Sequence, residues 1–483
     1  MTFLPRWPIT PRATATGLWA LAWLVAALLS WLIPPMQSPD EMSHIHRAYL
    51  ISQGTLLLQP WPADLAGPVD NPEAAAFIKR ARQHGGRVGG PVDKTLLDYA
   101  DAYLMIAREA DKRLSATEKN QLAQLNWSDQ QRFYVIPGTG YYFPAIYAPQ
   151  ALGLAIGRTL GLSIERSYQL ARISILLVCF TLLSLACRLT VPNPLVAAML
   201  LLPMSVFQLV LPTIDGLTMA LSVLAASLFL RSADLGRKHA SASSWALATC
   251  IFLLATSRTH LLPLLAMPFY ISWRRSSRRD FYLGCGMAAA ALVWVLFALI
   301  ATNDPRIVRS HTTTQLLMHY ANHPAAFFKV VFASLGDTTL STFYQESFVG
   351  ILGWLDTRLT AYFYPVLWTG LALCGLVSVS ASTLRQDWSA RLLLAAMSLA
   401  SVGLIFLALL VTWTPHPTLL VQGVQGRYFL VPMILLGFVA SGFGTASWTL
   451  QSPLRRWLAG LVFVSFALTS LTALILTLLR RYH

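Results

Sequence analysis

A short stretch just after the first apolar run of the chain combines acidic, imidazole and guanidinium side chains. Asp40, His44 and Arg47 have i, i+4 and i+7 spacing, so a helix would place them on one face. A carboxylate within reach of a hydroxyl can act as a general base, and cationic groups stabilise negative charge that develops on phosphate oxygens. This stretch therefore predicts a site for acid–base and phosphate chemistry close to a membrane surface.

Ser38 and Glu41 predict where this helix begins. Their spacing is typical of a capping box, and Pro39 occupies the position of a first helical residue. In this interpretation Glu41 caps the helix. Asp40 either interacts with the helix dipole or does chemistry, and we keep both acids as candidate catalytic residues.

Three further polar residues stand at the ends of later apolar runs. Asp215 follows the segment Leu211–Ile214, which a proline bends, whereas Arg258 and His260 share a short hairpin. Polar side chains close to the hydrocarbon are costly, which makes them functional candidates. Asp215 is a candidate second acid, and Arg258 and His260 are candidate phosphate ligands. The alternatives are a turn-forming role for Asp215 and a snorkelling role for Arg258.

Arg427 is a candidate phosphate ligand whose neighbours in the sequence suggest its role. It lies between Gly426 and Tyr428, with Gln425 before them, at the expected start of a helix. Glycine permits a close backbone approach, and a planar guanidinium suits a phosphate group. We expect Arg427 to bind phosphate, with Gln425 and Tyr428 in support. The alternative is an ordinary anchor at the membrane interface.

The histidines leave a metal site open as an alternative, because imidazole and carboxylate groups are common metal ligands. The histidines considered are His44, His46, His260 and His416. No close pair of ligands stands out beyond Asp40 and His44. We therefore name no metal ligands and no certain cofactor, and a divalent metal ion stays an open alternative.

The overall composition is that of a polytopic membrane protein. The chain has 483 residues, a mean hydropathy of +0.55, 55% hydrophobic residues and only 12% charged residues. Soluble domains carry about twice that charged fraction. The net charge of +15 lies largely in short loops, as the positive-inside rule expects, so we expect membrane lipids and no nucleic acid as partners. The five cysteines lie within apolar runs without paired spacing and predict neither disulfides nor a metal cluster.

Apolar runs that alternate with basic loops predict an all-α membrane protein, a single membrane domain of residues 1–483 with about eleven transmembrane helices. The expected spans are residues 17–33, 168–187, 194–211, 217–230, 245–256, 261–273, 281–301, 361–379, 392–411, 428–443 and 457–479. Arg6 and Arg12 place the N-terminus in the cytoplasm, and the basic cluster Arg274–Arg279 is the strongest cytoplasmic marker. This topology brings the candidate site residues to the outer side of the membrane.

Two long outer segments, residues 34–166 and 302–360, interrupt the series of spans. The first contains a Gly-rich hinge (84–90), an amphipathic stretch (94–125) and an aromatic block (133–147) that suits the membrane interface. Segments 143–162 and 325–350 are either spans or interfacial helices, and both interpretations stay open.

Three motifs spread over nearly the whole chain carry a resemblance to a known superfamily. They are Pro39–Tyr49, Leu352–Thr357 and Gly423–Phe429. The chain resembles the GT-C superfamily of membrane glycosyltransferases, which use polyprenyl-linked sugars and carry an acid in the first outer loop. More closely, it is similar to a family of predicted bacterial membrane proteins, long described as a domain of unknown function, that is related to these enzymes.

The resemblance implies roles for individual residues. Asp40 matches the catalytic acid of the first outer loop, and Asp215 matches a second acid in position. The sequence around Asp215 departs from the patterns of better-known branches, which leaves metal binding undecided. The motif Leu352–Thr357 either contacts acceptor or sugar or packs at the interface.

These residues and the resemblance together lead us to expect glycosyl transfer. A sugar would move from a polyprenyl-phosphate-linked donor to an envelope glycan, lipid or protein on the periplasmic side of the bacterial inner membrane. Asp40 would be the base, and Arg427 and Arg258 would hold phosphate. The alternatives are a transporter or flippase for a lipid-linked saccharide and a non-catalytic envelope assembly factor. The sequence shows no inverted repeat and no matched pair of broken helices, the usual signs of a transporter.

Overall fold

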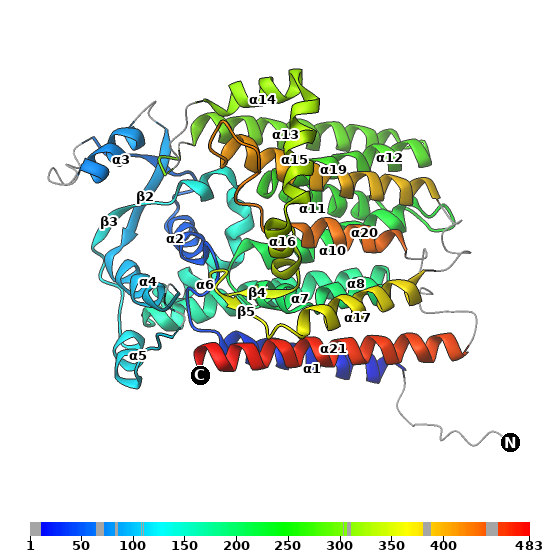
Figure 1. Cartoon of the computed structure of the whole chain (residues 1–483), viewed down its shortest axis with the longest axis horizontal. Coiled ribbons are helices and arrows are strands. Elements are labelled where there is room, and N and C mark those ends of the chain that lie inside the picture. Colours follow the sequence, from blue (N-terminus) through cyan, green and yellow to red (C-terminus); the bar gives the residue numbers. More distant parts are fainter. Residues whose placement is uncertain are drawn as a thin grey trace.

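Long helices that run side by side form the body of the molecule, as the apolar composition predicts. The computed structural model describes residues 11–63, 72–82, 86–107, 109, 111–302, 304–306, 311–379, 388–440 and 453–483. The helices form a bundle, and the first outer segment gathers at one end of it (Figure 1). The first and last helices, α1 (Pro11–Leu32) and α21 (Pro453–Tyr482), lie side by side along one edge.

Five of the described helices are long and apolar enough to cross a membrane. They are α7 (Ile164–Leu189), α10 (Ile214–Ala233), α13 (Arg278–Ala301), α19 (Trp388–Thr412) and the part of α21 from Trp457 on. Two further bundle helices, α11 (Ser241–Ser257) and α17 (Phe363–Ser378), are shorter. The helical membrane class is confirmed, whereas the count of about eleven spans stays a prediction.

The helices of the bundle differ sharply in how much of their apolar surface is covered. Within the most apolar 18-residue stretch of each helix, 89% of α10 is buried inside the protein, whereas only 22% of α13 is. Large apolar side chains such as Trp31, Trp245 and Ile300 are exposed on the outside of the bundle. An apolar exterior of this extent needs a lipid environment, so α10 forms the centre of the bundle and α13 lies at its periphery.

One predicted span is broken in the structure. Residues 194–211 form two short helices, α8 (Pro194–Leu200) and α9 (Pro203–Leu209), and the prediction of one continuous span is wrong. Pro203 lacks the N–H that would continue α8 and instead starts α9 as a first-turn residue.

Two other predicted spans begin with a tighter turn. Residues 261–273 begin in the 3-10 helix η4 (Thr259–Leu265) and continue as α12 (Ala266–Arg275). Residues 428–443 begin in η5 (Gly426–Phe429) and continue as α20 (Leu430–Val439), and residues 441–443 lie outside the described part of the chain.

The first outer segment contains a small sheet, which the all-α prediction missed. Strands β1 (Gln59–Pro60), β2 (Arg87–Asp93) and β3 (Gln131–Val135) pair antiparallel in the order β1-β2-β3. Residues 87–90 of the predicted Gly-rich hinge are therefore strand, and residues 84–85 lie outside the described part of the chain. Gly89 serves close packing, because a Cβ on it would lie 2.0 Å from the carbonyl oxygen of Tyr134.

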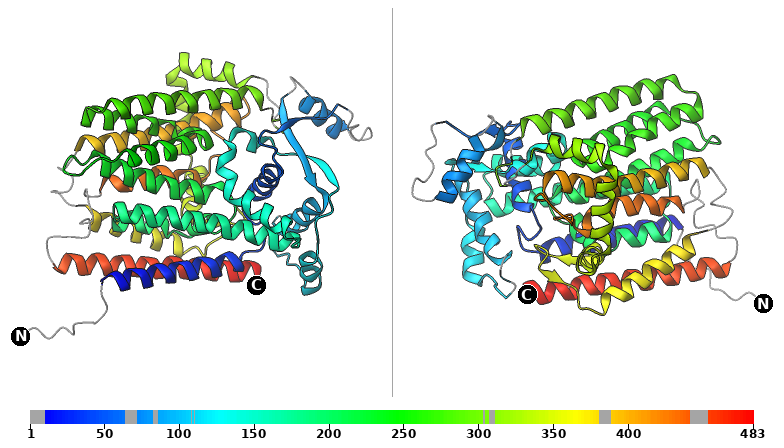
Figure 2. Two further views of the ribbon diagram at one scale, coloured as in Figure 1. Left: turned by 180° about the vertical axis from the view of Figure 1, so that it is seen from behind. Right: turned by 45° about the horizontal axis from the view of Figure 1, so that its top comes forward.

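Short helices complete the first outer segment. They are α2 (Glu41–Ser52), α3 (Pro72–Arg82), α4 (Lys94–Ala107), α5 (Ala116–Ala123), η2 (Pro137–Tyr141), η3 (Pro144–Tyr147) and α6 (Ala148–Thr159). The stretch 94–125 is thus two helices rather than one amphipathic stretch. With 12 residues, α6 is about 18 Å long and too short to span a bilayer, so it packs against α7 instead. Figure 2 shows α2 between the sheet and the bundle end.

The described residues of the second outer segment form three short helices and a hairpin. The elements are α14 (Thr313–Asn322), α15 (Pro324–Gly336), α16 (Thr338–Gly350), β4 (Ile351–Leu352) and β5 (Thr357–Arg358). Neither α15 nor α16, at 13 residues each, is long enough to span a bilayer, so segment 325–350 contains no span. Arg481 pairs with Asp356 at 3.2 Å, which ties the C-terminal end of α21 to this hairpin.

Candidate functional site

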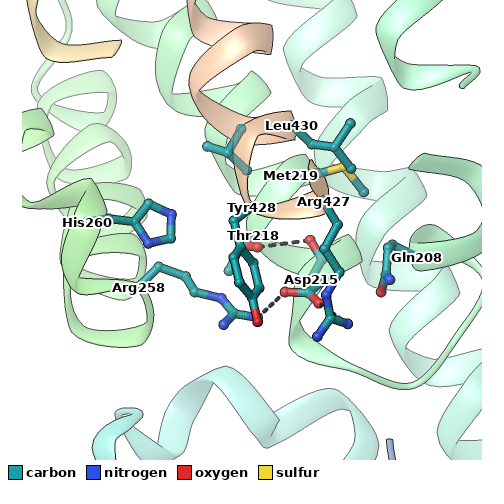
Figure 3. Close-up of a pocket in the computed structure, with 10 residues that line it drawn as sticks. Gln208, Asp215, Thr218, Met219, Arg258, His260, Arg427, Tyr428 and Leu430 are labelled. Atoms are coloured by element: carbon teal, nitrogen blue, oxygen red, sulfur yellow. Dashed lines mark hydrogen bonds and ion pairs between the residues drawn. The ribbon is translucent and has the colours of Figure 1, made fainter. Parts of the chain in front are cut away.

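Four charged residues predicted from the sequence come together at the end of the bundle that the first outer segment covers. The Nη2 atom of Arg427 lies 3.4 Å from Oδ2 of Asp40, and its Nη1 atom lies 3.5 Å from Oδ2 of Asp215. Arg258 forms an ion pair with the other carboxylate oxygen of Asp215. Figure 3 shows Asp215 between the two guanidinium groups. These four residues are far apart in the sequence, and the predicted topology had placed them at the same end of the bundle.

Asp40 stands in the turn before α2 in an uncommon backbone conformation. Its φ is 64°, in the left-handed region, which aspartate tolerates better than most residues. Its side chain is 59% exposed, whereas that of its partner Arg427 is only 4% exposed. The structure therefore presents an accessible carboxylate beside a buried guanidinium group.

The predicted capping box before α2 is only half formed. The helix begins at Glu41, and its N-cap residue Asp40 makes no side-chain capping hydrogen bond. Glu41 does reach back, because its carboxylate accepts hydrogen bonds from the backbone N–H groups of Ser38 (2.9 Å) and Met36 (3.3 Å). The hydroxyl of Ser38, however, has no hydrogen-bond partner among the described residues. The left-handed turn at Asp40 delays the helix start from Pro39 to Glu41.

Glu41 also has a second role that the sequence did not suggest. Its carboxylate lies 3.7 Å from Nη2 of Arg172 and accepts a hydrogen bond from the hydroxyl of Tyr168, and both ion-pair side chains are at most 1% exposed. Arg172 also donates to the carbonyl oxygens of Ile33 (2.7 Å) and Pro34 (3.1 Å) at the end of α1. Glu41 therefore belongs to a buried clamp between α1, α2 and α7, and Asp40 alone of the two acids faces the site.

The sequence did not identify Arg172 as a positioning residue, because it lies inside an expected transmembrane span. A lone arginine within an apolar run was the available signal, since a charge at membrane depth needs a partner. The partner itself, Glu41, could not be read from the sequence, because the pairing joins two distant segments.

Arg427 is held in place by its neighbours in the chain. A Cβ on Gly426 would lie 2.1 Å from the carbonyl oxygen of Tyr344, so only glycine allows η5 to pack on α16. The Gly426 N–H donates to the hydroxyl of Ser347 at 2.8 Å. The guanidinium group of Arg427 lies over the ring of Tyr428 at 5.3 Å. The predicted close backbone approach is confirmed at this glycine.

Three buried polar atoms around Arg427 make no hydrogen bond to the described part of the chain. They are Nε and Nη1 of Arg427 and Oε1 of Gln425, although Nη1 lies 3.5 Å from the Asp215 carboxylate as an ion pair. Buried polar groups are almost always satisfied, so such atoms point to a ligand or to water. A phosphate group offers acceptor oxygens that suit the two guanidinium donors.

The candidate supporting residues of α2 divide between the site and the protein interior. His44 faces the site side and shares a 2.8 Å hydrogen bond with the hydroxyl of Tyr147. Burial lowers the pKa of His44 to about 4, so its ring is neutral at pH 7. Arg47 instead donates to the carbonyl oxygens of Thr55 and Leu56. The predicted common face therefore holds for Asp40 and His44, which both face the site, but not for Arg47, which closes the loop after the helix.

Arg258 and His260 reach the site from the turn between α11 and η4. Arg258 donates to the hydroxyl of Tyr142 at 3.4 Å and lies over the ring of the same residue at 5.4 Å. Tyr142 belongs to the block predicted to sit at the membrane interface, and its contact with the site was not foreseen. His260 lines the pocket beside Arg258 (Figure 3). Burial lowers the pKa of His260 to about 3, so this ring is also neutral.

The histidines do not gather around a metal position. Across the described ranges, no three His, Cys, Asp or Glu side chains are grouped so that they could hold a metal ion. His46 packs edge-on against Tyr134, and neither of its ring nitrogens has a hydrogen-bond partner in the described chain. His416 shares a 3.1 Å hydrogen bond with Tyr320, away from the candidate acids.

Two cavities adjoin the charged cluster. The first, of about 20 Å³, lies between Asp215, Arg258 and Arg427 and has room for about one water molecule. The second is larger, about 230 Å³, and opens between α13 and α19. Its polar wall is formed by Tyr142, Arg258, His260 and Tyr428, and its apolar wall by Val295, Leu299, Ile405 and Leu409. A polar head with an attached apolar chain would match these two walls.

The motif Leu352–Thr357 supports the turn that carries Asp40. The indole N–H of Trp354 donates to the carbonyl oxygen of Met36 at 2.9 Å. The motif lies in the β4–β5 hairpin, which α21 holds through the Arg481–Asp356 pair. The contacts in the structure are therefore those of the packing alternative.

The fold and the site together define a multi-pass helical membrane protein with a charged cluster beneath an outer segment. Residues 23–436 match a protein family described as predicted membrane protein (DUF2142), and the chain belongs to this family. The matched range contains every candidate site residue discussed above. No curated protein matches the chain.

Proposed function

We propose that this protein is a GT-C-type membrane glycosyltransferase that transfers a sugar from a polyprenyl-phosphate-linked donor to an envelope glycan, lipid or protein. The observation that carries the proposal is the exposed carboxylate of Asp40 beside the buried guanidinium of Arg427, whose Nε and Nη1 atoms make no hydrogen bond to the described residues. Glycosyl transfer from a lipid phosphate needs both a base and a cationic phosphate site.

The phosphate of the donor would bind between Arg427 and Arg258. Asp215 bonds to both guanidinium groups and would hold them apart at a fixed spacing. As the bond between the anomeric carbon and the phosphate oxygen breaks, its electron pair leaves with the phosphate. The two arginines would stabilise this charge in a site that water barely enters.

Asp40 would take the proton of the acceptor hydroxyl while the acceptor oxygen forms its bond to the anomeric carbon. Its exposure leaves room for an acceptor to approach, and Arg427 lies 3.4 Å from the carboxylate. The acceptor would approach from beneath the first outer segment, on the periplasmic side of the bacterial inner membrane.

The larger cavity suits the lipid part of such a donor. Its polar wall shares Arg258, His260 and Tyr428 with the charged pocket, and its apolar wall belongs to α13 and α19. A polyprenyl chain could therefore stay in the lipid while its phosphate reaches the two arginines.

The decisive experiment compares Asp40→Asn with a matched control, Asp129→Asn. Asp129 has the same left-handed backbone (φ 56°), is 77% exposed and also pairs with an arginine, Arg158, but it lies outside the site. Asparagine keeps the size and tolerates this backbone, so both variants should fold. We expect Asp40→Asn to lower turnover by about 10²–10⁴-fold, the usual share of general-base catalysis.

The readout is the envelope glycan profile of cells that lack the protein and are complemented with each variant. Transfer by purified protein is then measured with the polyprenyl-phosphate sugar that this profile indicates. Asp40→Asn should resemble the empty strain, and Asp129→Asn should restore the wild-type profile. Unchanged glycans in the empty strain, or full activity of Asp40→Asn, would overturn the proposal and favour a non-catalytic assembly factor.

The break between α8 and α9 keeps a transporter as the second candidate. Discontinuous helices often form transporter sites, and Gln208 of α9 lines the charged pocket. Net movement of a lipid-linked saccharide across vesicles that contain purified protein, without sugar transfer, would favour this alternative.

A further inference from the structure

A second lipid-facing groove lies between α11 and α13, away from the charged cluster. It has a volume of about 660 Å³, within the usual size range of ligand pockets. One face of each helix lines it, with Trp245, Ala248, Thr249 and Phe252 from α11 and Arg279, Tyr282, Leu283, Gly286 and Met287 from α13. None of these residues lines the cavities of the candidate active site.

The groove is closed toward the candidate active site by aromatic packing. Phe252, at its inner end, packs edge-on against Phe143 with ring centroids 5.0 Å apart. Phe143 packs in the same way against Trp294. A molecule in the groove is thus separated from Arg258 by at least one layer of rings, and the groove is a site of its own.

The mouth of the groove is basic and aromatic. Arg279 is the second residue of α13, and its side chain is 44% exposed. Trp245 and Tyr282 are 62% and 70% exposed beside it. Amphipathic rings of this kind settle at the level of lipid headgroups.

The acidic group nearest to Arg279 is turned into the protein. Asp280 lies 3.7 Å from Nη2 of Arg279, but its side chain is only 3% exposed and it pairs with His239 at 3.1 Å. Arg279 also donates to the hydroxyl of Ser244 at 3.0 Å. An anion at the mouth would therefore meet the guanidinium of Arg279, which Arg278 precedes in the chain.

The depth of the groove fits one end of a phospholipid. From Arg279 to Met287 the helix rises about 12 Å, which leads from a headgroup into the acyl region. Near the inner end of this stretch, Gly286 leaves open space, because a Cβ built on it would meet nothing within 4 Å.

We propose that the α11–α13 groove binds an anionic phospholipid, with its phosphate on Arg279 and an acyl chain along Gly286 and Met287. Basic pockets between membrane helices select anionic headgroups, and the surrounding charge here is positive. The proposal does not depend on glycosyl transfer.

Native mass spectrometry of the detergent-purified protein tests the proposed lipid site. It compares the binding of phosphatidylglycerol with that of phosphatidylcholine that carries identical acyl chains. We expect the wild type to hold one phosphatidylglycerol with about fivefold preference over phosphatidylcholine, the contribution of one basic residue near an anionic lipid. Arg279→Gln should abolish this preference, and Arg279→Lys should largely keep it.

A second variant separates the groove from general surface charge. Gly286→Leu should fill the groove and reduce binding of both lipids, whereas Gly403→Leu, at a glycine of α19 that is equally free of neighbours, should bind as the wild type. Equal binding of the two lipids by the wild type would overturn the proposal. So would an unchanged preference in Arg279→Gln or unchanged binding in Gly286→Leu.

Discussion

Asp40 combines an accessible carboxylate with a backbone conformation that most residues avoid. A non-glycine residue in the left-handed region costs on the order of 1 kcal/mol and persists only where its surroundings fix it. Here the fixing contacts are the Glu41 carboxylate, which holds the backbone of Met36 and Ser38, and the indole of Trp354. The candidate catalytic carboxylate and the strained backbone thus belong to the same residue, as at many functional sites.

Arg427 offers a residue-scale test of phosphate binding. Arg427→Lys keeps the charge between the two carboxylates but loses the planar pair of donors. We expect this variant to lose about 2–4 kcal/mol of transition-state stabilisation, measured as the fall in kcat/KM for donor transfer at matched thermal stability.

The control for this measurement is Arg358→Lys, because Arg358 is 60% exposed and pairs with Glu346 outside the site. It should act as the wild type. If Arg427→Lys is also fully active, Arg427 is an anchor and the phosphate site must lie elsewhere.

The buried ring of His46 should make the stability of the folded protein depend on pH. Burial lowers its pKa from 6.5 to about 3, so the folded protein keeps this ring neutral while the unfolded chain binds a proton below about pH 6.5. Stability is therefore complete above pH 6.5 and falls as the pH drops toward 3. Between pH 7 and pH 5 the contribution of His46 to this loss is about 2 kcal/mol.

Thermal unfolding in detergent at the two pH values measures this loss. His46→Leu should reduce the loss by about 2 kcal/mol, because the ring makes no hydrogen bond that leucine would leave unsatisfied, while the buried His44 and His260 still contribute. His323→Leu, at an exposed position, should leave it unchanged. An equal loss in the wild type and His46→Leu would contradict the assignment.

At the scale of elements, the clamp between α1, α2 and α7 is the feature that positions Asp40. A purely capping role for Glu41 would make Glu41→Gln nearly neutral, since glutamine also serves a capping box. The buried ion pair between Glu41 and Arg172 instead predicts that Glu41→Gln is strongly destabilising. Glu41→Gln leaves a buried guanidinium without its counter-charge, which should cost about 3–5 kcal/mol of unfolding free energy.

The matched comparison is Glu346→Gln, which breaks a pair whose arginine is 60% exposed and should change stability by no more than about 1 kcal/mol. Thermal unfolding of both variants in the same detergent gives the answer. Glu41→Gln with the melting temperature of the wild type would show that the clamp contributes little.

The same elements show what the sequence could and could not predict. Alternation of apolar runs and basic loops was enough to bring Asp40, Asp215, Arg258 and Arg427 together, because helix ends on one side of a membrane share a surface. The Glu41–Arg172 pair could not be predicted, because it depends on the packing of α2 against α7. The break at Pro203 had a visible signal, a proline within an apolar run, that hydropathy averages out.

At the scale of the whole molecule, the helix directions place the charged cluster and the basic loops at opposite ends. Asp215 begins α10 and Arg231 lies near its end, so the 20 residues of this helix, about 30 Å, separate the two sides. Arg275 bonds to the carbonyl oxygens of Ser232 and Asp234 at the far end. The positive-inside rule predicts that this end faces the cytoplasm.

Cysteine labelling of intact cells tests this orientation in a protein whose native cysteines are replaced. An impermeant reagent should label Lys119→Cys on α5 and spare Leu235→Cys after α10, both of which are exposed positions. Both sites should react once the membrane is opened. Labelling of Leu235→Cys alone in intact cells would invert the topology.

The pairing of α1 with α21 sets the order in which the molecule can be completed. During synthesis α1 can dock on α7 through Arg172, but α21, which lies along it, comes from the far end of the sequence. At about 5–20 residues per second, α1 waits roughly 20–90 s for α21. His483, the final residue, then bonds to the carbonyl oxygen of Leu32 at 3.1 Å. A chain that ends before residue 453 would leave this face of α1 uncovered, so truncation should weaken the packing of the first helix as well as remove α21.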